Sequence, residues 1–246
     1  MDLDSSEVIH KRIAMLIDGD NAQPKLIEKM IRETEKFGIV TIRKIYGDWT
    51  TPQMNSWKDS LHRFAIQPVQ QFRYTAGKNN TDSALIIDAM DILHSKLVDG
   101  FSIVSSDSDY TRLATRIREE GLMVIGIGQK KTPEAFIKAC DRFIFTENIR
   151  GEVETTPARP QTEKTVRKKR ELLRLLREAY DMCVRDDEWV HLAILGEAIR
   201  KIEPGFDPRT YGQKRLITLI EAFPKQITVK KMEEKDPSAI YISFAD

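Results

Sequence analysis

Aspartates that could together bind a metal ion occur at three places in the first 150 residues of this sequence. The apolar run 13–17 (IAMLI) ends in DGDN, so that Asp18 and Asn21 follow it directly, and a second apolar run ends in SSDSD, which includes Asp107 and Asp109. Carboxylates that meet within a few ångströms raise one another's pKa values unless a cation lies between them. Oxygen ligands of this kind suit Mg²⁺ or Mn²⁺.

The third place is Asp82, at the start of a predicted helix and four residues after Lys78. A cation held by these carboxylates could bind a phosphate and lower the pKa of a bound water, which is the chemistry of phosphodiester hydrolysis. Asn21 could orient a water or a carboxylate, and Lys78 could offset transition-state charge. Ser105, Ser106 and the N–H groups that open the helix at 109 could hold phosphate oxygens.

Several other acids have a structural interpretation beside the functional one. Asp and Asn are common helix caps and turn residues. Asp88 and Asp91 fall in the middle of a predicted helix and are interpreted as a solvated face. Asp48 either lines the pocket or forms a turn, and Asp20 either faces the cluster or points away from it.

Alternating strand and helix patterns place these residues on one sheet. We predict strands at 13–17, 39–46, 66–72, 101–105, 122–127 and 142–145, and helices at 25–37, 53–64, 81–96, 109–120 and 133–140. Such alternation predicts an α/β fold, with a mainly parallel sheet flanked by helices. The carboxyl ends of parallel strands meet at one edge, where ligands bind at the topological switch point.

The pattern changes after a Pro- and Thr-containing segment that we interpret as a linker. Helices are predicted at 165–183, 189–202 and 211–222, followed by strands at 226–232 and 239–245, which together make a small winged helix-turn-helix. The predicted organisation is therefore a first domain at 1–150, a linker at 151–164 and a second domain at 165–246.

Basic residues of the second domain could face nucleic acid. The third helix offers Gln213, Lys214 and Arg215 with Tyr211 beside them, the hairpin offers Lys225, Lys230 and Lys231, and the segment 164–177 (KTVRKKRELLRLLR) has a single acid. Helix-turn-helix proteins present these elements to nucleic acid. The alternative is that hairpin lysines protect a sheet edge and that the basic segment is a solvated helix face.

Composition excludes several classes of protein. The 246 residues are 41% hydrophobic, with 39 basic and 38 acidic side chains, which fits a folded chain of nearly neutral charge. No apolar stretch approaches the ~20 residues of a membrane span, and the acidic start MDLDSSEV does not resemble a secretory signal. The two cysteines predict reduced thiols and a cytoplasmic location, while four scattered histidines argue against a histidine zinc site. Gly126 and Gly128 lack the third glycine of a dinucleotide motif.

The first domain resembles a NYN domain of the LabA-like branch, within the PIN-like nuclease superfamily. That group shows D-x-x-N after the first strand, a K-x-x-D-type element and S-G-D-S-D-F after the fourth strand. Here Ser106 replaces the glycine, Tyr110 replaces the phenylalanine and one extra residue separates Lys78 from Asp82. The resemblance implies a PIN-like parallel sheet and a metal-dependent ribonuclease whose metal-binding acids would be Asp18, Asp82, Asp107 and Asp109.

The second domain resembles OST-HTH, also called LOTUS, a winged-helix module. The matching residues are Leu195-Gly196, Phe206, Tyr211-Gly212 and Pro224. The resemblance implies binding of RNA or of protein partners. The candidate RNA contacts, Lys214, Arg215 and Tyr211, come from the predicted helix-turn-helix itself.

We therefore expect a metal-dependent RNA endonuclease with an RNA-recognition module. Two alternatives stay open. One is a catalytically degenerate adaptor that binds RNA or protein. The other is a haloacid-dehalogenase-type phosphatase with Asp18 as nucleophile and Asp20 as acid/base, although Asp82 would have no role in it.

Overall fold

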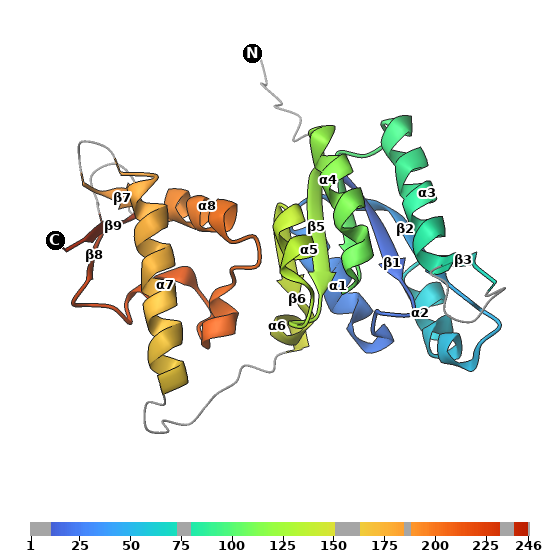
Figure 1. The fold of residues 1–246 in the computed structure, drawn as a ribbon, viewed down its shortest axis with the longest axis horizontal. Coiled ribbons are helices and arrows are strands. Elements are labelled where there is room, and N and C mark those ends of the chain that lie inside the picture. Colours follow the sequence, from blue (N-terminus) through green and yellow to red (C-terminus); the bar gives the residue numbers. More distant parts are fainter. Residues whose placement is uncertain (1–10, 73–79, 151–162, 185–187, 232–238, 246) are drawn as a thin grey trace, which may run out of the picture. The chain divides into compact units, whose positions relative to one another are not determined.

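The computed structural model describes residues 11–72, 80–150, 163–184, 188–231 and 239–245. The chain forms two compact units, Met1–Arg150 and Gly151–Asp246, which are described separately (Figure 1). Cys140 and Cys183 are unpaired thiols. Within the described ranges, no helix is both long and apolar enough to cross a membrane.

The first unit is built on a parallel sheet whose strand order is β3-β2-β1-β4-β5-β6. The strands are β1 (Arg12–Asp18), β2 (Ile39–Gly47), β3 (Gln67–Gln70), β4 (Gly100–Val104), β5 (Met123–Gly128) and β6 (Arg142–Phe145). The predicted α/β class and parallel sheet are confirmed. The order reverses between β1 and β4, which makes the carboxyl ends of these two strands the switch point where ligands bind.

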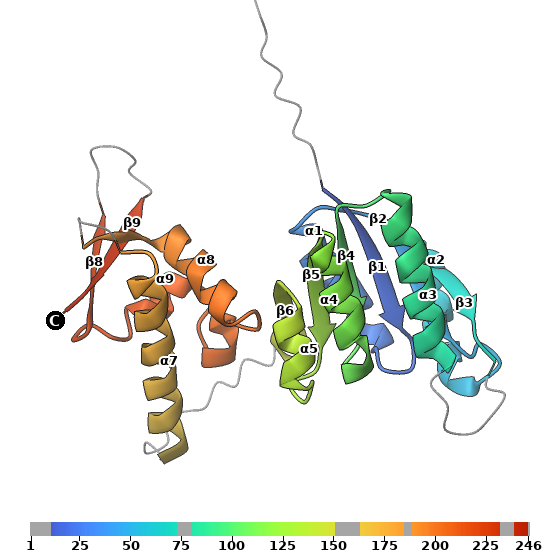
Figure 2. The same ribbon diagram turned by 45° about the horizontal axis from the view of Figure 1, so that its top comes forward.

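Helices cover both faces of this sheet, which explains why the central strands are largely apolar. On one face α3 (Asn80–Ser95), α4 (Thr111–Glu119) and α5 (Glu134–Ala139) enclose a core that includes Leu85, Leu113 and Phe136. The three helices lie together in front of the sheet in Figures 1 and 2. On the other face α1 (Ile27–Glu35), α2 (Lys58–Arg63) and α6 (Thr146–Arg150) enclose Met30, Trp57 and Ile149.

The first unit differs from the sequence prediction mainly at helix starts. Three predicted helices begin with a 3₁₀ turn, at Pro24–Leu26, Pro52–Trp57 and Ser108–Tyr110. In the first two, proline at the first helical position favours a turn but does not specify its hydrogen-bond spacing. α6 was not predicted, and its last residues fall where the linker pattern begins.

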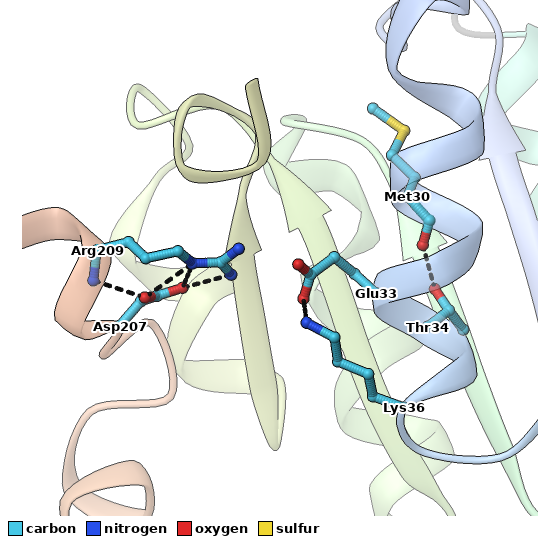
Figure 3. A network of polar contacts seen from close by, with 6 residues as sticks. All are labelled: Met30, Glu33, Thr34, Lys36, Asp207 and Arg209. Carbon is cyan, nitrogen blue, oxygen red and sulfur yellow. Dashed lines mark hydrogen bonds and ion pairs between the residues drawn. The ribbon is translucent and has the colours of Figure 1, made fainter. Parts of the chain in front are cut away.

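A buried hydroxyl joins α1 to the sheet. Thr34 Oγ1 donates to the carbonyl oxygen of Met30 at 3.0 Å and lies 3.2 Å from Ser102 Oγ on β4. Figure 3 shows the Thr34–Met30 bond beside the ion pair between Lys36 and Glu33 at the helix surface. The contact joins α1 to the face of β4 that is turned away from α3.

The second unit combines helices with a small antiparallel sheet of order β7-β9-β8. Its elements are α7 (Glu163–Asp181), β7 (Val190–His191), α8 (Leu192–Ile202), α9 (Leu216–Ile220), β8 (Ile227–Lys231) and β9 (Ile240–Phe244). Leu176, Leu195, Ile199, Ile220 and Ile242 form the centre of its core. The helices followed by a hairpin agree with the predicted second domain.

Two helix boundaries in this unit were predicted wrongly. Residues 190–191 form β7 rather than the start of a helix, and the third helix begins at Leu216 rather than at Tyr211. Asp207 caps a 3₁₀ turn, Pro208–Tyr211, through the Arg209 N–H and also pairs with the Arg209 guanidinium (Figure 3). Gly212 then adopts φ +77°, a left-handed conformation that ends the turn and separates it from α9.

Candidate metal centre

The end of β1 holds a buried carboxylate. Asp18 is 1% exposed, and its Oδ2 accepts hydrogen bonds from Asn21 Nδ2 at 2.7 Å and from Ser105 Oγ at 2.9 Å. Its Oδ1 accepts from the Asp20 N–H at 3.2 Å. A Cβ at Gly19 would lie 2.7 Å from the backbone oxygen of Tyr46, which is too close for a side chain. This position of the turn therefore requires glycine. The DGDN sequence therefore folds into a tight turn around its first aspartate.

The end of β4 is joined to this turn by Ser105. Besides donating to Asp18, Ser105 Oγ accepts the Asp107 N–H at 3.1 Å, and Ser105 is 2% exposed. Asp107 in turn caps the following 3₁₀ turn, because its Oδ1 accepts the Asp109 N–H at 3.0 Å. One buried hydroxyl thus fixes the two strand ends at the switch point relative to each other.

Three carboxylates converge above this junction. Asp82 at the start of α3, Asp107 after β4 and Asp109 in the next turn each have an oxygen within 4.8 Å of the others'. Asp82 and Asp107 are half-buried and Asp109 is exposed. Asp82 Oδ1 also accepts a hydrogen bond of 2.5 Å from the Tyr110 hydroxyl. We call Asp82, Asp107 and Asp109 the carboxylate cluster.

The cluster is electrostatically strained in the absence of a cation. Burial raises the pKa of Asp82, and the charges of Asp107, Asp109 and Asp20 raise it further, while the Tyr110 hydrogen bond lowers it. Burial also raises the pKa of Asp18, against the lowering effect of Asn21 and Ser105, and the charges of Asp82 and Asp20 add to the increase. Asp20 therefore acts on the cluster, although its side chain is exposed.

This strain predicts a pH dependence of stability. The pKa of Asp82 is raised in the folded chain above its ordinary 3.8, so the folded state binds a proton before the unfolded state does as the pH falls. In EDTA, Asp82→Asn should be more stable than wild type near pH 7. The difference should shrink as the pH falls through the raised pKa toward about 4. Thermal unfolding across this range tests it; a constant difference would contradict the expected uptake of a proton.

The other predicted residues of the first unit take several positions. Asp18 lies beside the cluster but is not one of the three residues whose oxygens meet. Asn21 is exposed and bonded to Asp18. Ser105 faces the interior, and Ser106 Oγ accepts the Gln129 N–H at 2.9 Å. Lys78 lies outside the described residues.

Two further acids, Asp48 and Asp88, have hydrogen-bonding partners in the protein. The sequence allows two interpretations of Asp48 and favours a solvated helix face for Asp88. Asp48 is buried, and its Oδ1 accepts from Thr50 Oγ1 at 2.6 Å and from Gln70 Nε2 at 2.9 Å, which is the turn interpretation. The solvated interpretation of Asp88 is wrong, because Asp88 pairs with Lys44 Nζ at 2.7 Å and accepts from the Tyr46 hydroxyl at 2.7 Å. Mid-helix position alone does not reveal which face meets β2.

Sequence reasoning did not identify Tyr110 as part of the site. Tyr110 is fully buried, and burial together with the charges of Asp18 and Asp82 raises its pKa, so the hydroxyl stays protonated as a donor to Asp82. The sequence signal that could have identified Tyr110 is its hydroxyl, because the S-G-D-S-D-F pattern has a phenylalanine at this position.

The candidate RNA contacts of the second unit lie around the start of α9. Lys214 and Arg215 are exposed. Tyr211 is half-buried with its ring centroid 6.0 Å from that of Phe206, and burial raises its pKa. The two cations are thus available to an anionic ligand, while Tyr211 is partly committed to packing.

Two known domain families match this chain. The family model of the NYN domain matches residues 12–148, which is more than half of the chain. The chain belongs to the NYN domain family. The model of the OST-HTH/LOTUS domain matches residues 164–239. The NYN domain points to the PIN-like nucleases and the OST-HTH/LOTUS domain to RNA binding.

Solved structures add little to these two matches. A protein of unknown function from Vibrio parahaemolyticus has 20% identity and a TM-score of 0.47, over 61% of this chain and 98% of that one. A protein from Brachyspira murdochii described as "ABC transporter, LacI family transcriptional regulator" has 16% identity and a TM-score of 0.26, over 82% of this chain and 55% of that one. No curated protein sequence matches the NYN protein significantly.

The residues of the NYN domain fit a divalent cation by their chemistry. The cluster supplies carboxylate oxygens from two different connections, and hard cations such as Mg²⁺ and Mn²⁺ prefer oxygen ligands. A cation would also remove the mutual repulsion that raises the pKa of Asp82.

Proposed function

We propose that the protein is a metal-dependent ribonuclease that hydrolyses RNA phosphodiester bonds. The observation that carries this proposal is the convergence of Asp82, Asp107 and Asp109 within 4.8 Å at the carboxyl edge of the sheet. The NYN family match supports the reaction class, and the OST-HTH/LOTUS match supports RNA as the substrate.

Each residue of the first unit has a proposed role. Asp82, Asp107 and Asp109 would hold Mg²⁺ or Mn²⁺, and Asp18, which the family resemblance includes in the acidic quartet, would complete the negative site. When bound, the cation supplies Lewis-acid chemistry at a phosphate group. Asn21 keeps Asp18 oriented through its 2.7 Å hydrogen bond. Ser105 positions Asp18 and Asp107 from beneath.

The remaining predicted residues are proposed substrate contacts. Lys78 would offset phosphate charge, and Ser106 keeps a hydroxyl hydrogen to donate because it only accepts from Gln129. In the second unit, Lys214 and Arg215 would contact the RNA backbone, with Tyr211 beside them. The unpaired thiols Cys140 and Cys183 support the prediction of a cytoplasmic location.

The phosphatase alternative is less well supported. A nucleophilic aspartate must reach the phosphorus of its substrate, whereas Asp18 is 1% exposed and accepts three hydrogen bonds. The adaptor alternative makes a different prediction from the nuclease: RNA would be bound and left intact.

Cleavage of labelled single-stranded RNA by the full chain tests the proposal. We expect fragments in Mn²⁺ or Mg²⁺ and none in EDTA, measured on several RNA sequences. Intact RNA under all metal conditions, together with measurable RNA binding, would favour the adaptor.

The Tyr110 hydroxyl should matter for metal affinity. Tyr110→Phe removes the donor to Asp82, which should cost about 1–3 kcal/mol of stability and weaken Mn²⁺ binding by ~10–100-fold in calorimetry. Tyr46→Phe is the matched control, because Tyr46 makes the equivalent bond to Asp88 on the same helix, away from the cluster. It should lose stability but keep its Mn²⁺ affinity; equal affinities in both variants would contradict the role of Tyr110.

A further inference from the structure

The small sheet of the second unit presents two different faces. Val190, Ile242 and Ile227 point into the core of this unit. Because side chains alternate along a strand, the neighbouring residues point outward. The outward residues are Trp189 just before β7, His191, Tyr241, Ser243, Thr228 and Lys230. We call this set the outer sheet face.

Strand pairing brings an imidazole, a phenol and an ammonium group side by side on this face. Tyr241 on β9 lies opposite His191 on β7 and opposite Lys230 on β8. The His191 and Tyr241 ring centroids are 5.2 Å apart and the rings are nearly perpendicular. Lys230 Nζ is 5.7 Å from the centroid of the Trp189 ring. Three rings and one exposed cation thus form a continuous patch across the three strands.

His191 has a structural role, because its Nδ1 accepts the Ala193 N–H at 3.3 Å and caps α8, but core packing does not account for Trp189 and Tyr241. None of its three rings belongs to the core of the second unit, and each is only half-buried. None of the outward residues of the described strands is acidic. A sheet face that served only to keep the protein soluble would carry charged residues of both signs rather than aromatic rings.

We propose that the outer sheet face is a stacking platform for the bases of single-stranded RNA, with Lys230 contacting the phosphate backbone. Exposed aromatic side chains on a sheet offer flat surfaces to unpaired bases, and a lysine among them complements the backbone charge. The inference rests on the proposed RNA-binding function but adds a site separate from Lys214, Arg215 and Tyr211.

Binding is measured in the Asp107→Asn background, so that RNA is not cut. The probe is a fluorescein-labelled oligoadenylate of ~12 nucleotides, followed by anisotropy with the full chain. Trp189→Ala and Tyr241→Ser should each weaken binding about tenfold, because one stacking surface is lost. Tyr241→Phe, which keeps the ring, should bind within about twofold of the parent, and thermal unfolding checks that each variant folds.

Two further readouts separate stacking from charge. Oligoadenylate should quench tryptophan emission in the parent, and the quenching should disappear in Trp189→Phe while Trp49 and Trp57 remain. Lys230→Gln should lower the slope of log affinity against log salt by about one, whereas Lys58→Gln, an exposed lysine of the first unit, should not. Inorganic polyphosphate, which has no bases, should bind the Tyr241→Ser chain as well as the parent.

The outcomes distinguish this proposal from the nuclease proposal. Binding that depends on Tyr241 and Trp189, even if the wild-type chain cuts no RNA, supports the platform and counts only against cleavage. Unchanged affinity and unchanged quenching in Trp189→Ala and Tyr241→Ser would overturn the platform and leave the nuclease standing. Absence of any oligoadenylate binding would also overturn it and would favour a protein partner for this face.

Discussion

Asp107→Asn should abolish RNA cleavage and leave the protein folded. Asp107 contributes an oxygen to the carboxylate cluster, and losing its charge weakens the site for a divalent cation. Lewis-acid stabilisation is worth several kcal/mol, so the rate at fixed metal concentration should fall by ~10³-fold or more. The asparagine oxygen can still accept the Asp109 N–H, so the cap of the following turn is kept.

The role of Asp107 in binding the cation can also be tested without an activity assay, by measuring protein stability. In EDTA the variant should be at least as stable as wild type, because one of the charges that add to the effect of burial in raising the pKa of Asp82 is gone. Mn²⁺ at a hundred times its dissociation constant should stabilise wild type by about 2.7 kcal/mol and the variant by much less. Asp59→Asn, at an exposed position of α2, is the matched control and should behave like wild type. A folded Asp107→Asn chain that still cuts RNA at the wild-type rate would refute the proposed site.

Ser105→Ala is expected to reduce both stability and cleavage. The hydroxyl donates to the buried Asp18 carboxylate and accepts the Asp107 N–H, so alanine leaves two groups without this partner. A hydrogen bond to a charged group contributes about 1.5–3 kcal/mol, which sets the expected loss in free energy of unfolding. Cleavage should fall by ~10–100-fold, because Asp18 and Asp107 are no longer held together.

The control for this variant is a buried serine of β4, the strand that Ser105 follows. Ser102 is fully buried, and its hydroxyl lies 3.2 Å from Thr34 Oγ1, on the side of the sheet that faces α1. Ser102→Ala should therefore lose stability without a comparable loss of cleavage by the folded protein. Denaturant unfolding and single-turnover cleavage separate the two effects. Parallel losses of stability and cleavage in both variants would show that Ser105 supports only the fold.

Local signals in the sequence were sufficient for the architecture of the first unit. Its central strands are recognisable because a parallel sheet covered on both faces makes them largely apolar. DGDN and SSDSD each follow such a strand, and parallel strands end at the same edge, so the sequence placed both motifs at one edge of the sheet. In the second unit, the alternation of apolar and polar residues was sufficient to predict the hairpin. The start of α9 could not be predicted in this way, because it depends on the left-handed conformation of Gly212.

The tertiary structure decided which side chains meet. Asp82, Asp107 and Asp109 share one cluster because α3 packs over β1 and β2 and contacts the 3₁₀ turn that follows β4, whereas Asp18 is held beneath by Ser105 and Asn21. Asp88 is paired with Lys44 rather than solvated because its face of α3 meets β2. Spacing along the chain fixes which edge or face a residue occupies, but the direction of a side chain depends on hydrogen bonds to residues distant in sequence, and only the folded chain contains these.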